Sequence, residues 1–179
     1  MGGAGWNIRD AALLGFVGAI LTLIPYYVNI AGLVLVLVAL YMLARAYGND
    51  NIWRYALYAV VTAIVGSVLV MGIGFTVILT TILSFPRPVS PTSFSHAVLT
   101  TVIAILAAAY VVMVISGYFW RHGYGELARS SGVERFERAG WWLFIGAATA
   151  IVLVGIALYV VGMIYVILGF NELMSRSQP

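Results

Sequence analysis

The feature that most constrains this chain is a series of apolar runs that are too long for the core of a soluble domain. These runs cover residues 11–47, 52–85, 94–120 and 140–170, and the charged residues cluster at or between their ends. Only 8% of the 179 residues are charged, whereas a soluble domain carries about 25%. About 20 consecutive apolar residues cross a bilayer as a helix. The sequence therefore predicts an all-α integral membrane protein, with a single transmembrane helical domain over residues 1–179.

The first apolar run predicts two helices. A straight helix over residues 11–47 would be about 55 Å long at 1.5 Å per residue, whereas a bilayer core is about 30 Å thick. Pro25 and Asn29 lie in its middle, where proline removes a helix donor and asparagine favours a turn. We therefore expect a hairpin of helices over residues 8–24 and 28–47, followed by single helices over 52–85 and 94–120.

The last apolar run allows either one long helix or a second hairpin, because no strong turn signal interrupts it. The segment from Phe16 to Ala19 matches that from Phe144 to Ala147, and with two extra residues Gly32 falls on Gly162. If the first and last runs are repeats, the break lies near residues 155–159. We therefore expect a bundle of six transmembrane helices, with five as the alternative.

Arginine supplies all nine basic charges. With six helices, eight arginines lie on one side and only Arg87 on the other; with five, Arg176 changes sides. Because arginine-rich loops stay in the cytoplasm, we expect a multi-pass protein of the cell membrane with a cytoplasmic N-terminus. Residues 121–138 form the main cytoplasmic loop, and Ser131 and Glu134 have the spacing of a capping box that starts the next helix. The loop arginines expected to make contacts are Arg121, Arg129, Arg135 and Arg138.

The residue inventory offers little for chemistry. The absence of cysteine excludes disulfides and thiolate sites. All six acids lie at or outside the expected helix ends, so the intramembrane carboxylates that mark ion pumps are missing from the sequence. His96 and His122 lie about 39 Å apart along one helix, so they cannot share a metal or haem. We expect no catalytic site, no metal and no cofactor, and the hydroxyls of Ser67 and Thr76 to bond their own helix backbone.

Small residues recur at helical spacing in the first and last apolar runs. Such faces let helix backbones approach closely, which matters in lipid because packing replaces the hydrophobic drive. Packing of helices within the chain is the simpler interpretation of these residues, and docking of a partner subunit is the more specific one. The candidate residues are Gly15, Ala19, Gly146, Ala150, Gly155, Gly162 and Gly169.

Two stretches resemble a known family. Gly132-Val-Glu-Arg-Phe-Glu-Arg-Ala-Gly140 leads into Ile145-Gly-Ala147, and the opening holds Phe16-Val-Gly-Ala-Ile-Leu and Asn51-Ile-Trp-Arg-Tyr-Ala-Leu-Tyr58. These stretches are similar to the DUF996 family of largely archaeal membrane proteins, over most of the chain. The resemblance implies a multispanning archaeal protein without an assigned activity, and it brings no catalytic residues. A thermophilic source fits the absence of cysteine and the scarcity of glutamine.

Three function classes follow. The leading hypothesis is a non-catalytic accessory or structural subunit that packs against other membrane proteins, for example in a respiratory or other energy-transducing complex. The alternative is a small transporter or channel formed by oligomerisation, which hairpin repeats favour. A lipid-acting enzyme would use Arg121, His122, Glu126 and Arg129, but a solvated, positive-inside loop explains them better. The expected partners are membrane lipid and other membrane protein subunits, without nucleic acid.

Overall fold

The computed structural model describes residues 7–24, 27–83, 91–152 and 154–177, and these form six helices and no strand. The prediction of an all-α chain with six helices is confirmed over this part. The four longer helices, α2, α3, α4 and α6, are long and apolar enough to cross a membrane. The helices are α1 (Ile8–Thr22), α2 (Tyr27–Tyr47), α3 (Asp50–Leu83), α4 (Pro91–Ser131), α5 (Glu134–Ala148) and α6 (Val154–Arg176).

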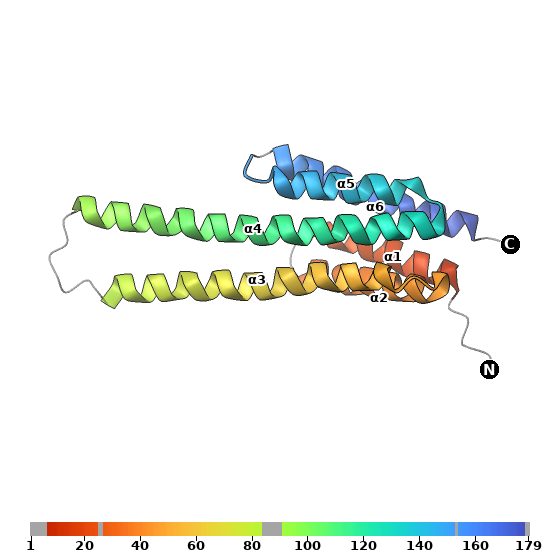
Figure 1. Cartoon of the computed structure of the whole chain (residues 1–179), viewed down its shortest axis with the longest axis horizontal. Coiled ribbons are helices and arrows are strands. Elements are labelled where there is room, and N and C mark those ends of the chain that lie inside the picture. The colour runs from red at the N-terminus through yellow and green to blue at the C-terminus, as the bar shows by residue number, and fades with distance from the viewer. Residues whose placement is uncertain (1–6, 25–26, 84–90, 153, 178–179) are drawn as a thin grey trace.

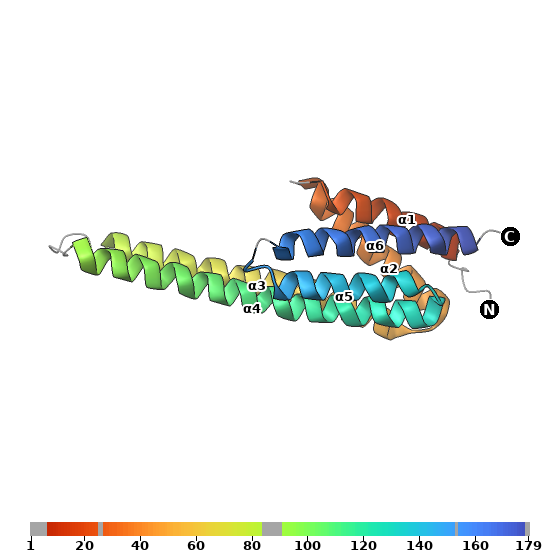
Figure 2. The same cartoon turned by 90° about the horizontal axis from the view of Figure 1, so that it is seen from above.

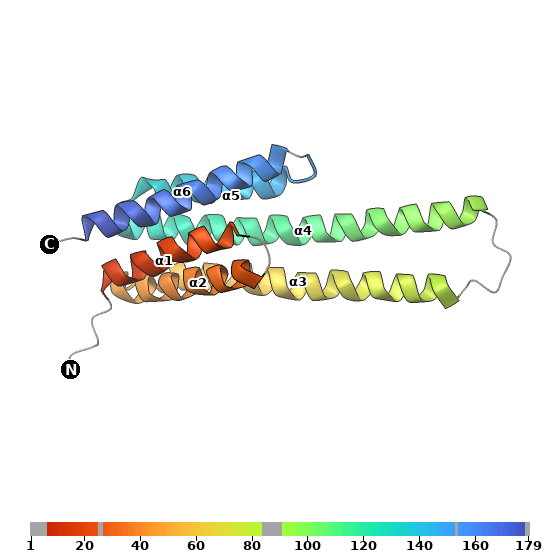
Figure 3. The same cartoon turned by 180° about the vertical axis from the view of Figure 1, so that it is seen from behind.

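The helices run up and down and close into a ring at one end of the molecule (Figures 1 and 2). Each helix packs on its neighbour in the chain, and α6 packs on α1, which closes the ring. α3 and α4 are longer than the others and continue beyond the ring as a two-helix hairpin (Figure 3). We call residues 68–83 and 91–109 of this hairpin the α3–α4 extension. The two ends of the chain lie at the opposite end of the molecule.

The first hairpin forms where the sequence predicts it. The side chain of Asn7 caps α1 by accepting a hydrogen bond from the Arg9 amide, as an N-cap residue does. The side-chain amide of Asn29 donates to the Thr22 carbonyl across the turn. Gly18 lies against the backbone of Gly32, so α1 and α2 touch without a side chain between them. Pro25, the expected helix breaker, lies outside the described residues.

The polar segment 121–138 differs from the expected loop. α4 continues to Ser131 and α5 begins at Glu134, so nearly all of the segment is helical. Gly132 turns the chain with a φ of 69°, a backbone conformation that glycine adopts at little cost. Ser131 does not cap α5, because its hydroxyl donates to Leu127 on its own helix and the N-cap position is Val133.

The last apolar run does divide in two, but earlier than the expected break at residues 155–159. α5 ends at Ala148, and the hydroxyl of its C-cap Thr149 donates to the Ile145 carbonyl at 2.7 Å. Gly155 lies against the backbone of Thr149 and Ala150, where a Cβ would collide. The chain therefore turns without proline, because Gly155 leaves room for α6 to fold back over the end of α5.

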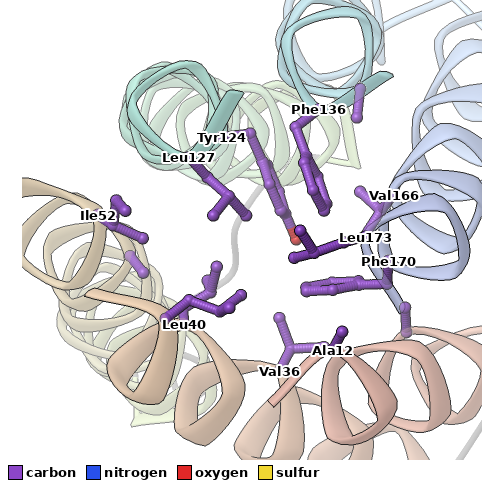
Figure 4. Packing of buried hydrophobic residues seen from close by; sticks show 14 of the residues in the cluster. Ala12, Val36, Leu40, Ile52, Tyr124, Leu127, Phe136, Val166, Phe170 and Leu173 are labelled. Atoms are coloured by element: carbon purple, nitrogen blue, oxygen red, sulfur yellow. The ribbon is translucent and has the colours of Figure 1, made fainter. Parts of the chain in front are cut away.

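The core fills the ring near the end where the chain termini lie. Figure 4 shows side chains from all six helices converging on its axis. The rings of Tyr124 and Phe136 stack with centroids 6.1 Å apart, and Phe136 meets Phe170 edge-on at 5.0 Å. The largest fully buried side chains are Phe136, Phe170, Leu40, Leu43, Ile52, Leu127, Val133 and Val166.

Candidate functional site: the arginine-rich end and an internal chamber

Arginines gather at the end of the ring that holds the chain termini. They lie in the first two turns of α1, α3 and α5 and in the last turns of α2, α4 and α6, except for Arg121, which lies ten residues before the end of α4. In the up-and-down ring these six helix ends lie at the same end of the molecule. We call this the arginine-rich end. Arg87, expected on the other side, lies outside the described residues. The arginines toward this end are Arg9, Arg45, Arg54, Arg121, Arg129, Arg135, Arg138 and Arg176.

Acidic side chains at this end tie the helices together. Glu126 accepts hydrogen bonds from Arg129 at 2.8 Å and from the side-chain amide of Asn49 at 3.2 Å, which joins α4 to the turn between α2 and α3. Glu172 on α6 pairs with Arg135 on α5 at 3.0 Å and with Arg176 one turn along its own helix. The charges therefore hold the ring together at its polar rim.

Each loop arginine predicted to make outside contacts also has a partner within the chain. The guanidinium of Arg121 lies 3.6 Å from the centre of the Trp141 ring, a cation–π contact between α4 and α5. Arg138 pairs with Glu134 at 3.8 Å, and both side chains are largely exposed. Contact of these arginines with lipid or a partner subunit stays a prediction.

The residues weighed for a lipid-acting enzyme do not form one group. Arg121, His122 and Arg129 line a small cavity of about 100 Å³, and His122 Nδ1 lies 2.9 Å from the Tyr118 carbonyl. Glu126 does not line that cavity, because its carboxylate is held by Arg129 and Asn49. No three histidine, cysteine or acidic side chains lie close enough to hold a metal ion in the described part of the chain.

The predicted glycines lie at close helix contacts. A Cβ at Gly15 would collide with the Phe170 ring, where α1 meets α6. At Gly162 it would lie 2.8 Å from the Leu143 backbone, at Gly169 2.8 Å from the Phe136 ring, and at Gly146 2.6 Å from the Tyr159 backbone. These four positions let α6 approach α1 and α5. Docking of a partner subunit on these faces stays a prediction.

The two predicted alanines differ in their surroundings. Ala19 is fully buried in the core, whereas Ala150 lies in the turn after α5 and is partly exposed. Hydroxyl groups on α3 bond their own helix as expected: Ser67 donates to Ala63 at 2.7 Å and Thr76 to Gly72 at 2.9 Å. These hydroxyls are thus satisfied within α3.

An internal chamber occupies the part of the ring next to the α3–α4 extension. It has two lobes of about 510 and 280 Å³, within the range of about 300–1,000 Å³ usual for ligand pockets. Ala63, Ser116, Trp120, Leu143 and Tyr159 line both lobes, so the lobes adjoin. The larger lobe continues along α3 and α4 to the extension. No charged side chain is among the described residues that line either lobe.

Polar groups with unused hydrogen-bonding capacity face this chamber. Tyr124 is only 3% exposed, yet its hydroxyl makes no hydrogen bond among the described residues. No fully enclosed side-chain oxygen in that part of the chain lacks a partner, so the Tyr124 oxygen is not fully enclosed, and Tyr124 lines the smaller lobe. Trp120 stacks on Tyr124 with centroids 5.5 Å apart, and its indole N–H is also without a partner there. Ser116, in contrast, donates to the Ala59 carbonyl at 3.0 Å.

The chamber residues escape prediction from the sequence for identifiable reasons. Tyr124 fell in the presumed loop, and Tyr159 fell in the presumed break of the last run. Trp120 and Tyr124 are four residues apart, so they share a helix face if α4 continues past Trp120. Their spacing is therefore a signal of the chamber once a continuous α4 is assumed. Asn29 was noted only as a turn residue, although it also lines the smaller lobe.

The comparisons with known proteins agree with the resemblance seen in the sequence. An uncharacterized protein of Methanocaldococcus jannaschii is 31% identical over 174 residues, which cover 93% of each chain. No solved structure matches. The family described as "Protein of unknown function (DUF996)" matches residues 28–164. The chain therefore belongs to the DUF996 family.

Proposed function

We propose that this protein is a non-catalytic integral membrane protein that packs against other membrane proteins as an accessory or structural subunit. The observation that carries the proposal is the α3–α4 extension, where large apolar side chains stand exposed on both helices. Met71 and Phe75 on α3 are 72% and 68% exposed, and Leu106 on α4 is 64% exposed. Exposure of so large an apolar surface to water is unfavourable, so lipid or protein covers it.

The length of the hairpin favours protein over lipid alone. The apolar part of α3 from Tyr55 to Leu83 is about 43 Å long, and that of α4 up to Trp120 is similar. With the arginine-rich end at the membrane surface, about 13 Å of apolar hairpin would pass beyond a core about 30 Å thick. Keeping it in lipid requires a tilt of about 45°, more than transmembrane helices usually adopt. A partner that covers the surplus removes this mismatch.

The extension also offers a place where another helix can approach. Gly72 lies on α3, and a Cβ added there would meet no atom within 4 Å. A small residue facing outward lets a neighbouring backbone pack closely. Gly66, by contrast, is already occupied by Val112 of α4. Gly72 is therefore the position that we assign to partner contact.

The arginine-rich end supports a cytoplasmic placement of both termini in the cell membrane. Positive charge at one end of a helical bundle is the usual determinant of orientation, and eight arginines lie toward that end of the ring. Tagging each terminus and testing its accessibility to a membrane-impermeant reagent checks this placement. Labelling of either terminus from outside intact cells would contradict it.

Purification from native membranes under mild solubilisation tests the packing role. We expect the wild-type chain to run as a complex of defined stoichiometry, identified by mass spectrometry, and Gly72→Leu to lose the partner. Gly125→Leu is the matched control, because Gly125 also has open space around it but lies at the arginine-rich end. A wild-type chain that is monodisperse and alone would contradict the proposal.

The chamber favours a second candidate function, passage of an uncharged solute by an oligomeric transporter or channel. The chamber is not a continuous pore, because the packed core around Phe136 and Phe170 closes the ring beyond it (Figure 4). Passage therefore requires these helices to rearrange. Flux of small neutral solutes into liposomes that hold the purified protein tests this candidate, and equal flux into empty liposomes rejects it.

A further inference from the structure

We infer that the internal chamber binds an uncharged, lipid-soluble molecule, with a carbonyl- or hydroxyl-bearing head beside Tyr124 and an apolar tail along α3 and α4. The site and the partner-binding face proposed above adjoin at Met71, which lines the larger lobe and is also 72% exposed on α3. Three properties of the chamber lead to this class of ligand: its lining, its free hydrogen-bonding groups and its opening.

The lining excludes a charged ligand. The larger lobe is bounded by alanine, glycine, valine, leucine and methionine with two serines and two aromatic residues, and no ionisable acid or base faces it within the described chain. A charge placed there would lose its hydration without gaining a counter-charge, which strongly disfavours binding. The occupant must therefore be neutral.

The free hydrogen-bonding groups place the head of the ligand. Tyr124 is only 3% exposed, and its hydroxyl has no partner among the described residues. Tyr159 on α6 lies close enough to interact electrostatically with it and lines both lobes. The indole N–H of Trp120 adds a third donor on the same wall. A buried donor such as the Tyr124 hydroxyl normally bonds an acceptor, and a carbonyl or hydroxyl oxygen supplies one. Trp120 is partly exposed and Tyr159 is 48% exposed, so these two donors line the more open part of the chamber.

The opening places the tail. The larger lobe runs past Val70 and Met71 on α3 and Ala109 and Met113 on α4. Tyr110 bonds the carbonyl of Ala148 at 2.6 Å, so the end of α5 lies at this level of α4. Beyond it only the apolar extension continues (Figure 2). A ligand thus arrives from the apolar phase, and methionines at the mouth adapt to chains of different shape.

Two sources share this chemistry: a membrane quinone, with ring carbonyls, and a neutral glyceride, with ester carbonyls and a hydroxyl. Decylubiquinone and 1,2-dioctanoylglycerol represent them as probes, and decanoate serves as the charged-head control. The full chain in detergent micelles is heated at increasing probe concentration, because a ligand that binds only the folded state raises the midpoint of unfolding. We expect one of the neutral probes to raise the midpoint, which assigns the source, and decanoate to leave it unchanged.

Two variants localise the binding. Ala63→Leu fills space shared by both lobes and should abolish the response, whereas Ala107→Leu, at an exposed position of α4 outside the chamber, should keep it. Tyr124→Phe removes only an unpartnered hydroxyl, so the fold is kept and affinity should fall about five- to tenfold, the worth of one hydrogen bond. Tyr58→Phe, on the outer face of α3, is its control.

Two results would overturn the inference. One is a midpoint that neither neutral probe raises. The other is a response that Tyr124→Phe and Ala63→Leu both leave unchanged, because the probe would then bind elsewhere or act through the micelle. If Ala63→Leu does not fold, the comparison of Tyr124→Phe with Tyr58→Phe still shows whether the probe binds beside the Tyr124 hydroxyl.

Discussion

The ring and the α3–α4 extension share the helices α3 and α4, yet the two regions differ in how their apolar residues are covered. Inside the ring, Tyr124 and Leu127 of α4 are at most 3% exposed, whereas Val102 and Leu106 of the same helix are 46% and 64% exposed. The ring packs through glycine contacts and aromatic stacking, whereas the described residues of the extension pack through the α3–α4 contact. Apolar character alone therefore does not create a core; shape and neighbours do.

The largest contrast between the two regions should appear on truncating an aromatic ring. Phe170→Ala removes a fully buried side chain from the centre of the ring, and we expect the free energy of unfolding to fall by about 3–5 kcal/mol. Phe75→Ala, in the extension, should leave it unchanged. Denaturant unfolding in detergent micelles measures both. Equal losses would show that the extension is packed as tightly as the ring.

The next largest contrast in stability should appear when a glycine in each region is replaced by alanine, which adds one methyl group. Gly146→Ala forces α5 away from the Tyr159 backbone, and we expect a loss of about 1–3 kcal/mol from overpacking. Gly72→Ala enters open space and should gain up to about 1 kcal/mol from helix propensity. Thermal unfolding of the two variants beside the wild type checks the signs. A destabilised Gly72→Ala chain would contradict the open space around Gly72 in the extension.

A smaller effect is expected at the arginine-rich rim. Glu172→Gln removes a carboxylate shared by Arg135 and Arg176, whose side chains are half-exposed, so the loss should stay below about 1 kcal/mol. Screening by salt should shrink the difference between variant and wild type. Unfolding measured at low and high salt tests this, and a difference that grows with salt would contradict an ionic cause.

The smallest effect should come from Arg138→Ala. Its partner Glu134 lies 3.8 Å away, and both side chains are largely exposed, so we expect no measurable change in unfolding. The same variant has one fewer basic charge for binding anionic vesicles. Retained stability with weaker vesicle binding would support the predicted lipid contact, whereas unchanged binding would count against it.

Apolar run length and Asn29 predicted most of the helices, because these signals are local. The continuation of α4 through residues 121–131 escaped prediction since glycines and charges there are typical of a loop. In the structure, Gly123 lies beside Tyr55 and Ala56 of α3, and Tyr124, Leu127 and Ala128 are buried. Their spacing of three and four residues is helical, but Gly123, Gly125 and the intervening charges obscured it.

The chamber could not be predicted from the sequence in the same way. Its wall joins Asn29 on α2, Trp120 on α4 and Tyr159 on α6, three residues that are far apart in the chain and unremarkable alone. Only the closure of the ring brings them together, and that closure depends on glycines whose partners lie on other helices. A local pattern cannot specify which glycine meets which ring.

The contact between α1 and α6 has a consequence for biosynthesis. Because a chain is made from its N-terminus, α1 is made before α6 and at first lacks this neighbour. Until α6 is made, the space beside Gly15 is not filled by the Phe170 ring, and the face of α1 that packs on α6 is uncovered. The ring can therefore close only after Phe170 has been made.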